Sequence, residues 1–157
     1  MSSHYTAILD ACVLYPAPLR SFLMYLAAGD QFRARWTEDI HEEWARNLLL
    51  NRPDLDKKKL ARVRELMDSH IPGALVTGYH SLIDGIIGLP DANDRHVVAA
   101  AIVAQAEAIV TFNLKDSPEL LYRHTTSTQS ILILLFPSWL TCISVLSWMP
   151  PGYIGLH

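Results

Sequence analysis

Cysteine is scarce in this chain of 157 residues, since only Cys12 and Cys142 are present. Two cysteines exclude a disulfide-stapled scaffold and a zinc site built from cysteine ligands. They also make a reducing, cytoplasmic setting the default expectation. A surplus of basic residues is lacking too, because 13 Lys and Arg face 16 Asp and Glu for a formal net charge of -3. That balance argues against a protein held on nucleic acid by its overall charge, although local basic patches remain open.

Several other signatures are missing. No G-x-G-x-x-G motif follows the first predicted strand, which excludes a Rossmann dinucleotide-binding domain. The 7 histidines are scattered, and no two of them have the i, i+4 spacing of a helical zinc site. The first residues contain no basic segment followed by an unbroken apolar stretch, so we expect no signal peptide.

Charge is absent from the last part of the chain. All 29 charged residues lie at or before Arg123, so residues 124–157 carry none. We therefore predict a domain over residues 1–123 and an atypical, charge-free apolar tail over residues 124–157. The tail is interpreted as a buried strand over 131–136 followed by an irregular segment, or as a frame-shifted C-terminus. No Lys or Arg closely flanks the apolar stretch 131–149, so we do not expect a membrane span.

Hydrophobic periodicity predicts strands that alternate with helices. The predicted strands cover residues 5–9, 32–36, 74–76 and 108–112. The predicted helices cover residues 19–28, 38–51, a segment through 71 that Asp54 or Asp56 caps, and 92–106. This order predicts an α/β fold, a three-layer α/β/α sandwich around a mainly parallel sheet of four to five strands.

Acidic residues stand where such a fold brings them together. Asp10 directly follows the first strand, and Glu43 lies beside the apolar stripe of the second helix. Asp91 and Asp94 open the alanine-rich helix. Because ligands bind beyond the carboxyl ends of parallel strands, these acids are expected at one edge of the sheet. Each alone also fits an ordinary role in a cap, a turn or a solvated helix face.

Two further polar residues, Asn113 and Asp116, follow the last of these strands, where turn chemistry is the alternative explanation. Several ionised carboxylates share a site only when a compensating charge is present. Hard divalent cations such as Mg²⁺ or Mn²⁺ supply that charge through oxygen ligands. An ion of this kind polarises a phosphate and activates water for hydrolysis.

Four segments of the chain resemble the PIN domain family, and in particular its VapC-like branch, the toxin components of toxin–antitoxin pairs. These segments are Ile8–Ala11, Trp36–Glu43, Leu89–Val97 and Ile109–Asp116. The resemblance extends over about residues 5–120 and is most specific across Asp91–Asp116. It implies a PIN-like fold and a metal-dependent endoribonuclease that uses one or two Mg²⁺ or Mn²⁺ ions.

The resemblance also implies roles for individual residues. Matching positions give the catalytic residues as Asp10, Glu43, Asp94, Asn113 and Asp116, and the metal ligands as Asp10, Glu43, Asp91, Asp94 and Asp116. Glu42 is a poorer candidate than Glu43 by its register on the helix. The implied partners are an RNA substrate and a protein antitoxin, and a homodimer is implied by the resemblance alone.

The chain departs from the family pattern as well. Ser117 stands where family members usually have Phe, and the charge-free tail replaces their mixed, charged ending. A second hypothesis is therefore a degenerate, catalytically inactive PIN domain that acts as an RNA- or protein-binding module. The presence of all the acids speaks against it.

Two more interpretations concern single features. A phosphatase with Asp10 as nucleophile is disfavoured, because Cys12 stands where that chemistry usually has a second acid. A basic run from Arg46 to Arg64 predicts either sequence-independent contact with RNA phosphates or a solvated helix face.

Overall fold

The computed structural model describes residues 5–89, 91–111 and the strand 132–135. Its centre is a parallel sheet in the order β2-β1-β3-β4. The strands are β1 (Thr6–Leu9), β2 (Arg33–Arg35), β3 (Ala108–Thr111) and β4 (Leu132–Leu135). Every residue of β1 and β3 is buried. This burial explains why both central strands read as continuous apolar runs, as is typical of parallel strands covered on two faces.

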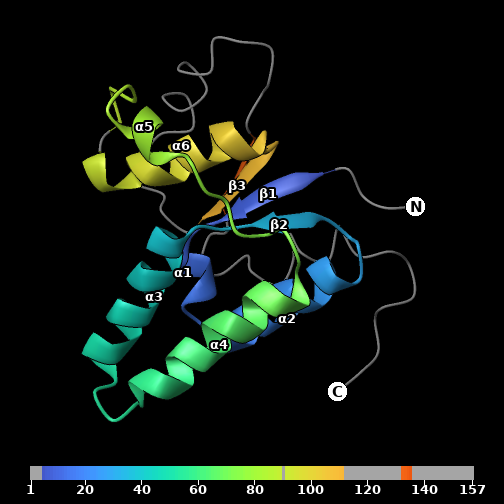
Figure 1. Ribbon diagram of the computed structural model, residues 1–157, viewed down its shortest axis with the longest axis vertical. Coiled ribbons are helices and arrows are strands. Elements are labelled where there is room, and N and C mark those ends of the chain that lie inside the picture. Colours follow the sequence, from blue (N-terminus) through green and yellow to red (C-terminus); the bar gives the residue numbers. More distant parts are fainter. Residues whose placement is uncertain (1–4, 90, 112–131, 136–157) are drawn as a thin grey trace.

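Helices cover both faces of the sheet. They are α1 (Ala11–Leu14), α2 (Ala17–Ala28), α3 (Glu38–Asn51), α4 (Lys57–His70), α5 (His80–Ile83), the 3₁₀ turn η1 (Ala92–Asp94) and α6 (Arg95–Ala104). Figure 1 shows α5 and α6 on one side of the sheet and α1 to α4 on the other. The predicted three-layer α/β/α class is confirmed, with four parallel strands.

Side-chain caps set where the two long helices begin. Thr37 Oγ1 accepts a hydrogen bond from the Ile40 N–H at 3.1 Å and starts α3, as its sequence predicts. Asp56 caps α4 by accepting from the Lys58 N–H at 2.8 Å. Of the two candidate caps, Asp54 is not used, because its carboxylate pairs with Arg52 at 2.8 Å.

The structure corrects one predicted strand and one predicted helix end. The predicted strand 74–76 is wrong, since this segment forms only one isolated bridge, between Leu75 and Trp36. Glycines in the left-handed region, Gly73 and Gly78, turn the chain on either side and leave too few extended residues for a strand. The helix predicted to reach residue 106 ends at Ala104, because Gln105 adopts a left-handed conformation.

A buried polar cluster joins α3 to α4. The Trp44 indole N–H donates to His41 Nδ1 at 3.1 Å, so the other ring nitrogen of His41 carries the proton and faces Asp68 at 3.1 Å. Asp68 also accepts from the Trp36 indole at 2.7 Å. Burial lowers the pKa of His41 despite the neighbouring Asp68 carboxylate. This cluster fixes the rotation of α3 and therefore the direction in which its polar face points.

The apolar tail is described only in part. Strand β4 pairs in parallel with β3, with Ile133 opposite Ile109, so the predicted strand over 131–136 is found. No helix in the described ranges is long and apolar enough to cross a membrane. The rest of the tail lies outside the described residues, and the division of the chain at residue 123 stays a prediction.

Candidate functional site

The carboxyl ends of β1 and β3 lie next to each other in the middle of the sheet, with Leu9 paired to Val110. The chain leaves β1 towards β2 on one side, while β4, which follows β3, lies on the other. Open parallel sheets form ligand crevices where neighbouring connections diverge in this way. Asp10 follows β1 and Thr111 ends β3, so both stand at this crevice.

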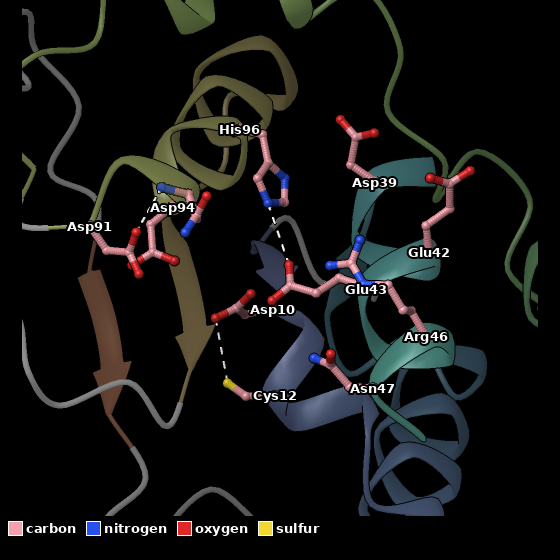
Figure 2. Close-up of a pocket in the computed structure, with 11 residues that line it drawn as sticks. Asp10, Cys12, Asp39, Glu42, Glu43, Arg46, Asn47, Asp91, Asp94 and His96 are labelled. Atoms are coloured by element: carbon pink, nitrogen blue, oxygen red, sulfur yellow. Dashed lines mark hydrogen bonds and ion pairs between the residues drawn. The ribbon is translucent and has the colours of Figure 1, made fainter. Parts of the chain in front are cut away.

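A cavity of about 640 Å³ opens at the same place. Figure 2 shows side chains from the end of β1, from α1, from α3 and from the start of α6 pointing into it. The lining residues are Asp10, Cys12, Asp39, Glu42, Glu43, Arg46, Asn47, Asp91, Asn93, Asp94 and His96. Six carboxylates against one guanidinium make the cavity strongly negative, which favours cations.

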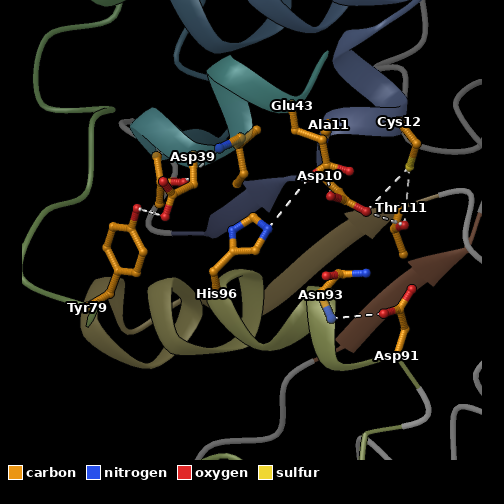
Figure 3. Close-up of polar contacts among 12 residues, drawn as sticks. Asp10, Ala11, Cys12, Asp39, Glu43, Tyr79, Asp91, Asn93, His96 and Thr111 are labelled. Atoms are coloured by element: carbon orange, nitrogen blue, oxygen red, sulfur yellow. Dashed lines mark hydrogen bonds and ion pairs between the residues drawn. The ribbon is translucent and has the colours of Figure 1, made fainter. Parts of the chain in front are cut away.

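The Asp10 carboxylate is held from two sides. Its Oδ1 accepts a hydrogen bond from the Ala11 N–H at 2.7 Å, so Asp10 caps α1. Its Oδ2 accepts from the Thr111 hydroxyl at 2.7 Å and lies 3.4 Å from Cys12 Sγ (Figure 3). Asp10 therefore does cap a helix, and the same hydrogen bond orients its carboxylate at the mouth of the crevice.

Glu43 meets His96 across the cavity, which links α3 to α6. Glu43 Oε2 lies 3.5 Å from His96 Nε2. Burial acts to lower the pKa of His96, but the hydrogen bond to Glu43 and the negative charges of Glu43, Asp39 and Asp10 outweigh it and raise that pKa. The contact with His96 therefore restrains the Glu43 carboxylate from the α6 side of the cavity.

The turn before α6 supplies two more acids. Asp91 Oδ1 accepts from the Asn93 N–H at 2.8 Å and caps η1, and its side chain is exposed. Asp94 is half-buried at the end of η1, and both carboxylates line the cavity. As with Asp10, a capping role and a place in the cavity go together.

The structure brings four of the predicted site residues to one cavity, namely Asp10, Glu43, Asp91 and Asp94. The poorer candidate Glu42 also lines it, but from an exposed position. The remaining two, Asn113 and Asp116, lie outside the described residues. The catalytic and metal-binding roles of all six remain predictions.

Sequence reasoning missed Asp39 and Asn47, which stand one turn before and one turn after Glu43 on α3. Their i, i+4 spacing around Glu43 is the signal that finds them. Asp39 Oδ2 accepts from the Tyr79 hydroxyl at 2.6 Å and lies 3.1 Å from His80 Nε2. Burial, together with the bond to Asp39, raises the pKa of Tyr79 to about 12.

The donors in the cavity fit a hard divalent cation by their chemistry, since they are mostly carboxylate oxygens. Among the described residues, no three Asp, Glu, His or Cys side chains converge closely enough to hold an ion together. Mg²⁺ commonly keeps several waters and takes only one or two protein carboxylates. A hydrated ion held by few carboxylates therefore suits this cavity better than a closed cage does.

Comparison with known families gives one match that covers more than half of the chain. A family model described as PIN domain matches residues 6–115. This span contains Asp10, Glu43, Asp94 and Asn113, while Asp116 lies one residue beyond it. No curated protein and no solved structure gives a significant match to the chain.

Proposed function

The chain belongs to the PIN domain family, and on that premise we propose that it is a metal-dependent ribonuclease that hydrolyses RNA phosphodiester bonds. PIN domains are in general metal-dependent nucleases. Our proposal adds that the substrate of this chain is RNA. The observation that supports it is the negative cavity at the carboxyl ends of β1 and β3. Three elements far apart in the sequence contribute Asp10, Glu43 and Asp94 to it.

Each residue has a distinct role in this proposal. Asp10 and Asp94 hold Mg²⁺ or Mn²⁺, and Asp91 is an auxiliary ligand. Glu43 and Asp116 complete the ligands or position water, and Asn113 orients water or a phosphate. When bound, the cation polarises the phosphodiester and makes water an effective nucleophile at neutral pH.

The hydrogen bonds of this chain pre-orient two of those carboxylates. The Thr111 hydroxyl and the Ala11 N–H leave Asp10 little freedom to rotate. His96 restrains Glu43 from the opposite wall. Groups of this kind, which orient metal ligands, tune affinity and activity without touching the ion.

We also propose the role of a toxin in a toxin–antitoxin pair, acting in the cytoplasm, with a protein antitoxin as partner and a homodimer as the working form. The support is the resemblance of the motifs around Asp10 and Asp94 to VapC-like PIN domains. Expression of the wild-type chain in bacteria is expected to stop growth, and expression of Asp94→Asn is not. Equal growth with both chains would remove the toxin role and leave the nuclease proposal standing.

A degenerate, inactive PIN domain that binds RNA or protein is the second candidate. The observation that favours it is that no three potential ligands converge on one point in the described ranges. Such a module would keep its partner when Asp10 and Asp94 become Asn, whereas a nuclease would lose cleavage.

The direct test is cleavage of a mixed RNA pool by the purified chain with Mn²⁺. We expect cutting that stops with EDTA and in Asp94→Asn. Asp84→Asn is the matched control, since Asp84 is an exposed acid outside the cavity. A folded wild-type chain that leaves RNA intact with Mn²⁺, or an Asp94→Asn chain that still cuts, contradicts the proposal.

A further inference from the structure

The charge on the polar face of α3 changes from negative to positive along the helix. Its first two turns place Asp39, Glu42 and Glu43 at the cavity, and the next turn places Arg46 at the rim. Beyond Arg46 the helix leads into a hairpin with α4, and Figure 1 shows α3 running away from the sheet to the loop that joins the two helices. Residues 46–59 contain five basic and two acidic residues, a net charge of +3 in a chain whose net charge is -3.

The basic residues of this hairpin fall into two groups. Three of the arginines already have acidic partners, in the pairs Arg52–Asp54, Arg62–Glu65 and Arg64–Glu38. The side chains of Arg46, Lys57, Lys58 and Lys59 are exposed. Within the described residues these four make no hydrogen bond and no ion pair through their side chains. They are the cations that remain available to an external anion.

The three lysines do not serve the stability of their own helix. They occupy the first turn of α4, which contains no acid. The helix dipole favours anions there and disfavours cations. Helix α3 shows the usual arrangement, with Glu38 and Asp39 in its first turn. A solvated helix face explains the exposure of the lysines but not their unfavourable position.

We propose that Arg46 and Lys57–Lys59 form a phosphate-binding surface that holds the RNA backbone beside the cavity. This inference rests on the proposed ribonuclease function and adds where the substrate strand lies. At about 1.5 Å per residue along a helix, Arg46 stands one turn beyond Glu43, and the end of α3 lies roughly 8 Å further on. Arg46 and the lysines beyond the end of α3 can therefore contact different phosphates of one strand.

The surface also resolves an electrostatic conflict. A cavity with six carboxylates repels a polyanion, so the strand needs cations outside the cavity to bring one phosphate to its edge. Arg46 stands at the boundary between the two charge regions and contacts the phosphates nearest the cut. Because phosphate contacts carry no base information, this surface binds strands of any sequence.

The test measures binding without cleavage, by fluorescence anisotropy of a labelled mixed-sequence single-stranded RNA in EDTA across a salt series. The triple change of Lys57, Lys58 and Lys59 to Gln is expected to weaken binding about tenfold or more at 0.1 M salt. The slope of log K against log salt should fall by roughly 2, at ~0.7 for each lost phosphate contact. Gln keeps a similar helix propensity, so unfolding does not account for the loss.

Two controls isolate the charge. Changing the three lysines to Arg retains their charge and should retain binding. Arg46→Gln should weaken binding severalfold, whereas Arg33→Gln should not. Arg33 is an exposed cation at the start of β2, at the opposite end of the strands from the cavity.

Unchanged affinity and an unchanged salt slope in the triple Gln variant overturn the inference, as does a wild-type chain with no salt-dependent RNA binding. Cleavage with Mn²⁺ is scored separately. If the wild-type chain cuts RNA and the triple variant binds and cuts equally well, the phosphate-binding surface is rejected and the ribonuclease function is retained. If binding depends on the lysines but no RNA is cut, the phosphate-binding surface is supported and the ribonuclease function is rejected.

Discussion

At the scale of residues, the position of the Asp10 carboxylate depends on two neighbours that are not acids. The Ala11 N–H fixes one oxygen and the Thr111 hydroxyl fixes the other. Thr111 is 8% exposed and lies at the end of a central strand, so it holds Asp10 from a rigid position. The site therefore depends on a threonine that would not bind the ion itself.

Thr111→Val tests this dependence. Val keeps the shape and the strand preference of Thr but removes the hydroxyl donor, so we expect Mn²⁺ affinity to fall about tenfold, as for other residues that orient metal ligands. Calorimetric titration with Mn²⁺ measures this change. Thr6→Val is the control, because Thr6 is also buried but lies at the opposite end of β1. Equal Mn²⁺ affinity in wild type and Thr111→Val would show that the hydroxyl does not orient Asp10.

Tyr79 gives the chain a defined response to alkaline pH. Its pKa of about 12 in the folded state lies above the ordinary value of 10.0. A group whose pKa is raised by folding adds stability below its unfolded pKa and loses it as the pH rises through the folded one. The contribution of Tyr79 is therefore complete below pH 10 and declines between about pH 10 and 12.

Urea unfolding between about pH 9 and 11 checks this response. The free energy of unfolding should fall less steeply with pH in Tyr79→Phe than in the wild type. Tyr25→Phe, at a tyrosine that is 62% exposed, should follow the wild type. Parallel curves for wild type and Tyr79→Phe would contradict the assignment.

At the scale of elements, α3 presents one face to the cavity because its other face is locked to α4. Asp68 accepts hydrogen bonds from the Trp36 indole and from His41, and both of these side chains are fully buried. The cation–π contact of Arg20 over the Trp44 ring, at 4.7 Å, adds a tie to α2. A helix anchored in this way cannot rotate Glu43 out of the cavity without breaking buried hydrogen bonds.

Asp68→Ala measures how much these buried hydrogen bonds contribute to the free energy of unfolding. Two buried donors lose their acceptor, so we expect a loss of about 1–3 kcal/mol in the free energy of unfolding, measured in urea. Glu65→Ala on the same helix removes an exposed acid paired with Arg62 and should cost less than about 1 kcal/mol. If both variants lose the same stability, the cluster does not anchor α3.

Several elements could be predicted from the sequence, and others could not. The periodicity of α3 and the Thr37 cap are local signals, and they predict that helix correctly. Helix α1 was missed because four residues carry too little periodicity, although its cap is Asp10 itself. The apolar segment 74–76 is read as a strand because its composition fits one, but the left-handed glycines beside it act through backbone geometry.

The same contrast holds for the site. Asp10, Glu43, Asp91 and Asp94 could be expected at one edge of the sheet from the alternation of strands and helices, since ligands bind beyond the carboxyl ends of parallel strands. The contact of Glu43 with His96 could not, because it depends on the distance between two helices on opposite faces of the sheet. Nor could the bond of Thr111 to Asp10, because it depends on the register of β1 against β3.

At the scale of the whole molecule, the sheet order β2-β1-β3-β4 sets the place of the cavity. The crevice lies between β1 and β3 because the chain continues from them in opposite directions. Strand β4 comes from the charge-free tail and pairs along the full length of β3. The tail therefore takes part in the sheet that carries the site.

A chain shortened to residues 1–123 tests the role of the tail. Removing β4 makes β3 an edge strand that is paired only with β1. We expect this to lower the free energy of unfolding and to promote association. Urea unfolding and sedimentation measure both effects. A shortened chain that is as stable as the full chain and no more associated would show that β4 is dispensable, and would support an independent domain over 1–123.

The central claim is that carboxylates from separate elements form one cation site, and Mn²⁺ binding by calorimetry in the absence of RNA tests it most directly. We predict that the wild type and Asp84→Asn bind Mn²⁺ with the same affinity, and that Asp10→Asn and Asp94→Asn each bind it at least about tenfold more weakly. Binding that is unaffected by Asp10→Asn and Asp94→Asn, or a folded wild-type chain that binds no Mn²⁺, would contradict the claim.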